Sequence, residues 1–237
     1  QGQGRAMRHA TTFAVVPVKA LGLAKRRLAP ALPDAARRRL VLTMLEDILT
    51  AAVSVEGIAR ILVVTPDREV AALAERRGAA IVPEPNIEPG SQLNAAVEGG
   101  IAFALARGAA QALILPADVP LATPAELASL IESRGVKPGV TLAPSHDSNG
   151  TNALLLAPPN AITPCYGPGS YLQHMSQAMA RHIDVHVMHL PGIARDIDEP
   201  ADLVHLSAAG GERYAFLAPY LAGLRGTPDH TASAEEQ

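Results

Sequence analysis

The feature that most constrains the fold is a regular alternation of short apolar segments with longer helical ones. Residues 13–18 (FAVVPV), 61–65 (ILVVT) and 112–115 (ALIL) are short and apolar, as buried strands of a parallel sheet are. Residues 34–52 carry their apolar side chains at helical spacing. Strands that alternate with helices predict an α/β fold, in which a mostly parallel sheet is covered by helices on both faces.

The rest of the chain continues this pattern, and 237 residues suit one domain. We expect a single-domain, three-layer, Rossmann-like sandwich over residues 12–225. Residues 1–11 are expected to be flexible, and one interpretation is that the part before Met7 is a cloning remnant. Residues 226–237 have the composition of a disordered tail. Further strands are expected at 80–82, 140–143, 153–156 and 185–189, and further helices at 67–77, 92–107, 123–133, 170–181 and from 200.

Composition excludes several classes of function. A net charge of -3 and 3% aromatic residues disfavour nucleic-acid binding. The single cysteine, Cys165, can form neither an internal disulfide nor a cysteine-based zinc site, which favours a cytoplasmic location. No apolar run approaches the ~20 residues that span a bilayer, and the polar start lacks the apolar core of a secretory signal.

A basic loop follows the first predicted strand. It contains Lys19 and Lys25 together with Arg26 and Arg27, but only one glycine, Gly22. Cations at the carboxyl end of a strand suit a phosphorylated ligand. The loop matches neither the phosphate-binding loop of kinases nor the glycine fingerprint of dehydrogenases, so both classes are disfavoured. The alternative is a solvated basic loop.

Three carboxylates indicate a divalent metal. Asp118 comes just after the strand at 112–115, and Asp196 and Asp198 flank Ile197, so that in an extended segment both face the same way. Like charges on one side are costly unless a cation lies between them, and magnesium (Mg2+) prefers oxygen ligands. The alternative is that these residues are structural: Asp118 would cap a helix or form a turn, and Asp198 would cap the helix expected from residue 200.

Two further segments have the character of anion or nucleotide sites. Thr151 precedes an apolar strand, and Gly167 and Ser170 (in YGPGS) lie at a predicted helix start, where backbone N–H groups bind anions. Gly90 and Asn94 lie where another loop enters a helix and are candidates for contact with a base or ribose. The alternative for Ser170 is a simple helix cap, and Cys165 beside it is more often a packing residue than a nucleophile.

One family carries motifs like these in the same order. The chain resembles the guanylyltransferases of coenzyme F-420 biosynthesis, within the molybdenum-cofactor-type nucleotidyltransferases, over about residues 13–206. The matching motifs are VPVKALGLAKRRL, PEP with QLNAA, LPADVPL, GTNALLL, YGPGS and RDIDEP. The resemblance implies a nucleotide-diphospho-sugar-transferase-like fold. It assigns phosphate binding to Lys19 and Lys25, magnesium to Asp118, Asp196 and Asp198, and the phosphate of a small acid to Thr151, Gly167 and Ser170.

The resemblance also implies a reaction. The family joins GMP from GTP to phosphoenolpyruvate, 2-phospho-L-lactate or 3-phospho-D-glycerate, releases pyrophosphate, and passes the product to a deazaflavin transferase. QLN replaces the usual GLN before Asn94, and Cys165-Tyr166 replaces a usual Phe before GPGS. His146 offers a hydrogen-bond donor or acceptor, and Cys165 leaves space that a bulkier side chain would fill. Both features favour the longer, more polar acid, 3-phospho-D-glycerate; the alternative is that the two residues only pack. Open alternatives are a transferase for molybdopterin or a sugar phosphate, and a non-catalytic nucleotide-binding regulator. Whether the chain forms a homodimer is also open.

Overall fold

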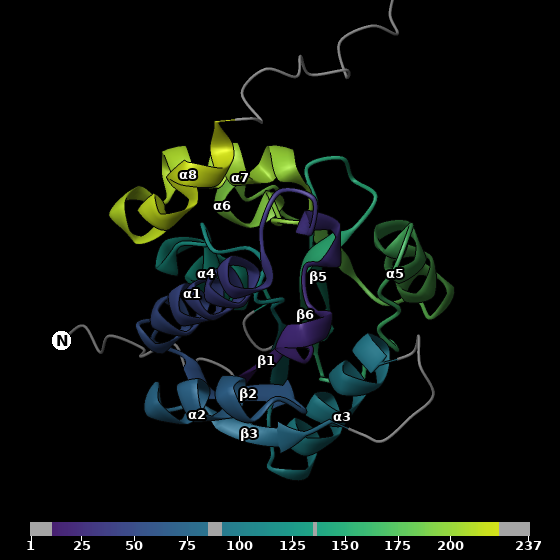
Figure 1. Ribbon diagram of the computed structural model, residues 1–237. Helices are drawn as coiled ribbons and strands as arrows, with labels where there is room; N and C mark the ends of the chain where they lie inside the picture. Colours follow the sequence, from purple (N-terminus) through teal and green to yellow (C-terminus); the bar gives the residue numbers. More distant parts are fainter. Residues whose placement is uncertain (1–10, 85–91, 135–136, 223–237) are drawn as a thin grey trace, which may run out of the picture.

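A mixed seven-stranded sheet forms the centre of the molecule (Figure 1). The computed structural model describes residues 11–84, 92–134 and 137–222. The strand order is β3-β2-β1-β4-β6-β5-β7. Only β6 runs against its neighbours β4 and β5, so the sheet is mostly parallel, as predicted. The strands are β1 (Thr12–Pro17), β2 (Ile58–Thr65), β3 (Ala80–Pro83), β4 (Gln111–Ile114), β5 (Gly139–Pro144), β6 (Thr151–Ala157) and β7 (Val185–Val187).

Helices connect these strands. The α-helices are α1 (Asp34–Val53), α2 (Arg68–Arg76), α3 (Gln92–Ala106), α4 (Pro124–Glu132), α5 (Ser170–Ala180), α6 (Pro191–Ala194), α7 (Pro200–Ala209) and α8 (Ala218–Leu221). Short 3-10 helices are η1 (Leu21–Leu23), η2 (Arg26–Leu28) and η3 (Gly211–Leu217). No helix in the described ranges combines the length and the apolar character needed to cross a membrane.

The alternation of side chains along β1 divides the core in two. Ala14 and Val16 pack in the cluster that holds the buried faces of α1, α2, α4 and α7, whereas Phe13 and Val15 face α3. Farther along the sheet, α5 covers the same face as α3. Figure 1 shows α3 and α5 on one side of the strands and α1, α4 and α7 on the other. The three-layer sandwich predicted from the sequence is confirmed.

Helix α3 lies unusually close to β1 because of one glycine. A Cβ atom built on Gly100 would lie 2.3 Å from a methyl carbon of Val15, so no larger residue fits without a shift. This close packing fixes the helix that follows residues 85–91, which lie outside the described part of the chain.

Local signals in the sequence set the starts of α2 and α4. Asp67 caps α2, and Thr123 and Glu126 form the capping box of α4, as their sequence contexts predict. Strand β7 ends at Val187 and not at His189, because it is an edge strand that pairs with β5 alone. The predicted N-terminal segment lies almost wholly outside the described residues, and the predicted tail lies wholly outside them.

Candidate active site

The candidate residues gather at one edge of the sheet. The lysine loop follows β1, Asp118 follows β4, and the segment with Asp196 and Asp198 follows β7 and α6. These are the carboxyl ends of parallel strands, where ligands bind in such sheets. Thr151 reaches the same edge from the opposite direction, because it begins the antiparallel strand β6, whose Leu154 pairs with Ile114 near the end of β4.

Lys25 is the centre of the cluster. Its Nζ atom donates to Asp118 Oδ2 at 2.8 Å and to Asp198 Oδ1 at 2.6 Å, while its side chain is only 9% exposed. Burial by itself lowers the pKa of Lys25, but the two aspartates outweigh burial and hold the pKa above its ordinary value. The same contacts lower the pKa of Asp198 against the opposing effect of its burial. This arrangement keeps Lys25 charged at the site.

The backbone holds Lys25 in an unusual conformation. Its φ of 51° lies in the left-handed region, which residues other than glycine rarely adopt. Such conformations persist where the surrounding structure imposes them, often at functional sites. Lys19 is exposed, and its positive charge favours the ionised form of both Asp198 and Glu84, which follows β3. The two candidate lysines therefore lie at one edge, one buried and one accessible.

Asp67 anchors the lysine loop as well as α2. Its Oδ1 accepts from the N–H groups of Glu69 and Val70, and its Oδ2 accepts at 3.0 Å from the N–H of Leu21. Of these two roles, only the cap of α2 has a local signal in the sequence. A contact between residues this far apart in the chain has no local sequence signal.

Asp196 and Asp198 lie on one side of an extended segment, as predicted. Ile197 between them is fully buried, and its N–H donates to the carbonyl oxygen of Asp118 at 2.9 Å. Burial, together with the charges of Asp118 and Asp198, raises the pKa of Asp196. Asn152 Nδ2 donates to Asp196 Oδ1 at 3.2 Å and so positions this carboxylate, a role that the sequence analysis did not assign.

Asp198 does not cap α7. Glu199 is the capping residue, and Asp202 completes the capping box by accepting from the N–H groups of Asp198 and Glu199. The carboxylate of Asp198 is therefore available to bind Lys25.

The chemistry of this carboxylate cluster fits a magnesium ion that arrives with phosphates. The raised pKa of Asp196 reflects burial and excess negative charge, which a cation would offset. Lys25 already lies between two of the carboxylates, and the described residues contain no group of three or more acidic, histidine or cysteine side chains arranged to hold a metal by themselves. Magnesium, however, is usually held by one or two carboxylates together with waters and substrate phosphates.

A second cluster, the anion loop, comprises Thr151 and residues 165–170. The hydroxyls of Thr151 and Ser170 are buried, and their oxygens lie 3.5 Å apart. Gly167 has a φ of 142°, in the range that favours glycine. Its N–H has no hydrogen-bond partner among the described residues, so it is available to an anion. The three residues that the sequence analysis grouped are thus brought together.

Asn94 connects α3 to the anion loop. Its Oδ1 accepts from the N–H of Tyr166 at 2.6 Å, and its Nδ2 donates to the carbonyl of Tyr166 at 3.1 Å. The amide group is therefore engaged with the protein itself, on the side of the predicted acid site. The other predicted nucleotide contact, Gly90, lies outside the described residues.

The two residues expected to set acid specificity have different surroundings. The thiol of Cys165 accepts from Gln177 Nε2 at 3.1 Å, and it is therefore directed at α5. His146 is exposed, and its backbone N–H donates to the carbonyl oxygen of Ala194 at 2.8 Å. Among the described residues, neither side chain forms a hydrogen bond with Thr151 or Ser170.

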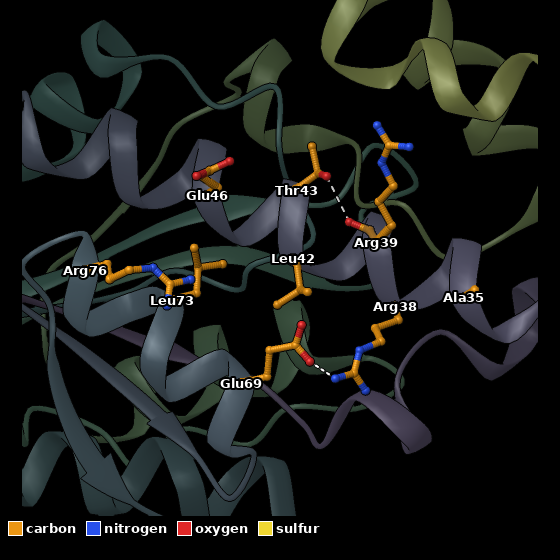
Figure 2. Close-up of a pocket in the computed structure, with 9 residues that line it drawn as sticks. All are labelled: Ala35, Arg38, Arg39, Leu42, Thr43, Glu46, Glu69, Leu73 and Arg76. Atoms are coloured by element: carbon orange, nitrogen blue, oxygen red, sulfur yellow. Dashed lines mark hydrogen bonds and ion pairs between the residues drawn. The ribbon is translucent and has the colours of Figure 1, made fainter.

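A separate hollow of about 350 Å³ lies between α1 and α2 (Figure 2). None of the candidate residues lines it. Three of its charged side chains form ion pairs: Arg38 pairs with Glu69, and Glu46 pairs with Arg77 and Arg213. These ion pairs brace the two helices, whereas the candidate residues gather at the sheet edge.

The mixed sheet, with cationic and carboxylate side chains gathered at its carboxyl edge, agrees with the class of nucleotidyltransferases. The chain belongs to the family described as "Guanylyl transferase CofC like", whose model matches residues 12–236. A phosphoenolpyruvate guanylyltransferase from Rubrobacter xylanophilus is 43% identical over 204 residues, which are 86% of this chain and 97% of the relative. One from Sphaerobacter thermophilus is 42% identical over 197 residues, or 83% and 93% of the two chains. The chain is a guanylyltransferase of this family.

Solved structures show the same fold at low identity. A protein of Desulfovibrio desulfuricans G20, provisionally named a nucleotide-diphospho-sugar transferase, has a TM-score of 0.72 at 12% identity, covering 91% of this chain and 97% of that one. A nucleotidyl transferase from Methanothermobacter has a TM-score of 0.60 at 18% identity, with 84% and 96% covered. The predicted nucleotide-diphospho-sugar-transferase-like fold is confirmed.

Proposed function

We propose that this guanylyltransferase joins the GMP part of GTP to the phosphate of phosphoenolpyruvate and releases pyrophosphate. One observation carries the proposal. Thr151 and Asn152 are consecutive residues of β6, yet Thr151 belongs to the anion loop and Asn152 binds Asp196 in the carboxylate cluster. Because the two residues adjoin at this edge of the sheet, an acid phosphate in the anion loop and a nucleotide at the carboxylate cluster would share that edge, as direct transfer between them requires.

The chemistry needs no general base. An oxygen of the acid phosphate is already a nucleophile at neutral pH, and it attacks the α-phosphorus of GTP in line. A new P–O bond forms there while the bond from the α-phosphorus to the bridging oxygen breaks, so that pyrophosphate leaves. Lys19 and Lys25 offset the charge that develops on the phosphates. Magnesium held by Asp118, Asp196 and Asp198 would supply further charge neutralisation.

Phosphoenolpyruvate replaces 3-phospho-D-glycerate as the favoured acid for two reasons. The two relatives described above are named for phosphoenolpyruvate. The sequence argument for the longer acid required Cys165 to leave space in the acid site, but its thiol contacts Gln177 on α5. The product is proposed to pass to a deazaflavin transferase in coenzyme F-420 biosynthesis, in the cytoplasm.

A competition assay tests the proposal. The purified protein is given magnesium, equal concentrations of phosphoenolpyruvate, 2-phospho-L-lactate and 3-phospho-D-glycerate, and either GTP, ATP or CTP, and the adducts are measured by mass spectrometry. We expect the phosphoenolpyruvate adduct to dominate, and GTP to be used in preference to ATP and CTP. A product pool dominated by either other acid would overturn the assignment of the acid, and equal use of ATP would overturn that of the base.

A matched pair of variants tests the acid site. Thr151→Val removes the hydroxyl from the anion loop and is expected to raise KM for the acid about tenfold, the effect of a lost hydrogen bond to a charged group. Thr141→Val is the control, because Thr141 is also a buried strand threonine, but its hydroxyl pairs with Ser133 at 2.8 Å. Equal effects of the two substitutions on KM would contradict the placement of the acid.

A further inference from the structure

One buried histidine lies directly behind the anion loop. His174, on α5, is fully buried. Its Nδ1 lies 3.0 Å from Thr151 Oγ1, and its Nε2 lies 2.9 Å from the backbone nitrogen of Cys165. Tyr166 packs edge-on against the imidazole, with ring centroids 5.4 Å apart. The histidine thus contacts both segments that form the anion loop.

These partners fix the position of the imidazole proton. A backbone N–H can only donate, so Nε2 of His174 must accept and cannot carry a proton. Burial lowers the pKa of His174 to about 4, so the ring is neutral at neutral pH and carries its single proton on Nδ1. Nδ1–H therefore donates to the oxygen of Thr151.

The direction of this hydrogen bond determines what Thr151 can offer a ligand. Its oxygen accepts from His174 and, at 3.5 Å, from the hydroxyl of Ser170. The hydroxyl proton of Thr151 is therefore free to be donated. With the opposite tautomer, Thr151 would have to donate to the ring and would present only lone pairs to an anion.

The same histidine fixes the backbone before Gly167. His174 holds the N–H of Cys165, and Asn94 holds both the N–H and the carbonyl of the next residue, Tyr166. Two successive residues are thereby fixed just ahead of the N–H of Gly167, which has no partner among the described residues.

We propose that His174 is a positioning residue that makes the anion loop a hydrogen-bond donor to the acid phosphate, by orienting the hydroxyl of Thr151 and the backbone before Gly167. This inference rests on the proposed function, because it assumes that the acid phosphate binds in this loop. His174 itself does not touch the substrate.

Kinetics of His174 variants test this role. His174→Phe keeps the buried ring and removes both hydrogen bonds, and it is expected to raise KM for phosphoenolpyruvate about tenfold. KM for GTP should change less than about twofold, since the carboxylate cluster is held by other residues. His174→Gln, which can still accept from Cys165, and His174→Asn, which can still donate to Thr151, should each recover part of the affinity for the acid. Equal increases in both KM values would overturn the proposal.

A double-mutant cycle separates positioning from stability. If His174 acts through Thr151, adding Thr151→Val to His174→Phe should raise KM for the acid by much less than it does in the wild-type protein. Effects that multiply would contradict the proposal. Thr141→Val, a buried substitution away from the site, gives the change in KM that reduced stability alone produces.

Nitrogen-15 NMR of the histidine ring gives a readout that does not depend on the reaction. The wild-type protein should show His174 protonated on Nδ1 and unprotonated on Nε2 at neutral pH. A proton on Nε2 would overturn the proposal even if every variant failed to fold. If the wild-type protein forms no adduct with any of the three acids, the proposed function fails, while this NMR result still decides the orientation of the ring.

Discussion

Replacing Lys25 by methionine tests whether lysine and magnesium balance the same carboxylates. Methionine keeps the length and apolar stem of the side chain but removes the charge that binds Asp118 and Asp198. The variant should be less stable without magnesium, because the carboxylates then face one another without a cation.

The expected magnitude follows from the exposure of the partners. Removal of one partner from a buried ion pair costs about 3–5 kcal/mol. Asp118 and Asp198 are 30% and 42% exposed, so water screens part of their charge, and we expect a loss of about 2 kcal/mol. For a chain of this size, each kcal/mol shifts Tm by about 2–4 °C, which gives a decrease of about 4–8 °C.

Thermal unfolding with and without magnesium chloride measures both effects. Magnesium should raise Tm more in Lys25→Met than in the wild type. The corresponding gain in the free energy of unfolding is about 1.4 kcal/mol when free metal exceeds Kd about tenfold. Potassium chloride at equal ionic strength controls for screening. A decrease below about 1 °C would refute the pairing energy worked out above. Equal increases in Tm with magnesium in both proteins would show that Lys25 and magnesium do not balance the same carboxylates.

Four further outcomes are expected. Asp198→Asn should lower turnover at least about 100-fold at saturating GTP, because electrostatic stabilisation is usually a large part of catalysis; near wild-type rates would remove Asp198 from the site. Asp67→Asn keeps the cap of α2 but loses the acceptor for the N–H of Leu21, so KM for GTP should rise about fivefold and Tm should fall by about 2–4 °C. The Tyr166 hydroxyl is buried without a partner among the described residues, so Tyr166→Phe should gain about 1 kcal/mol in urea unfolding; a loss would show that the hydroxyl has a partner. The pKa of His174 is held near 4 in the folded protein, so the unfolded chain takes up a proton first as pH falls below about 6.5. The wild type should therefore lose more stability than His174→Phe between pH 6.5 and pH 4.

Much of the architecture could be predicted from the sequence because it depends on local patterns. Apolar strands, helical periodicity and the caps at Asp67 and Thr123 each act within a few residues. The direction of β6 could not be predicted in this way. Residues 153–157 are buried on both faces, so the apolar run has the same character in either direction and contains no signal for antiparallel pairing.

The residues of the candidate site also fall into two groups, those that local sequence patterns predict and those that they do not. The position of Asp118 could be predicted because it comes soon after a strand, and the positions of Asp196 and Asp198 could be predicted because they alternate across Ile197. Asn152 and His174 could not, because their roles depend on contacts across more than twenty residues, and neither residue type is rare in its local context. Asn94 shows the limit of motif reasoning, since its position was predicted but both polar atoms bind Tyr166.

The reversed strand β6 has a consequence for how the enzyme can diversify. Strands β5 and β6 form a hairpin whose turn, residues 145–150, opens at the active edge, whereas the lysine loop and Asp118 lie on connections that lead to helices. A hairpin turn can change length or composition without moving a helix or shifting the sheet. Variation in this turn can therefore reshape one end of the candidate site while the connections of the parallel strands, which carry Lys25 and Asp118, keep their geometry.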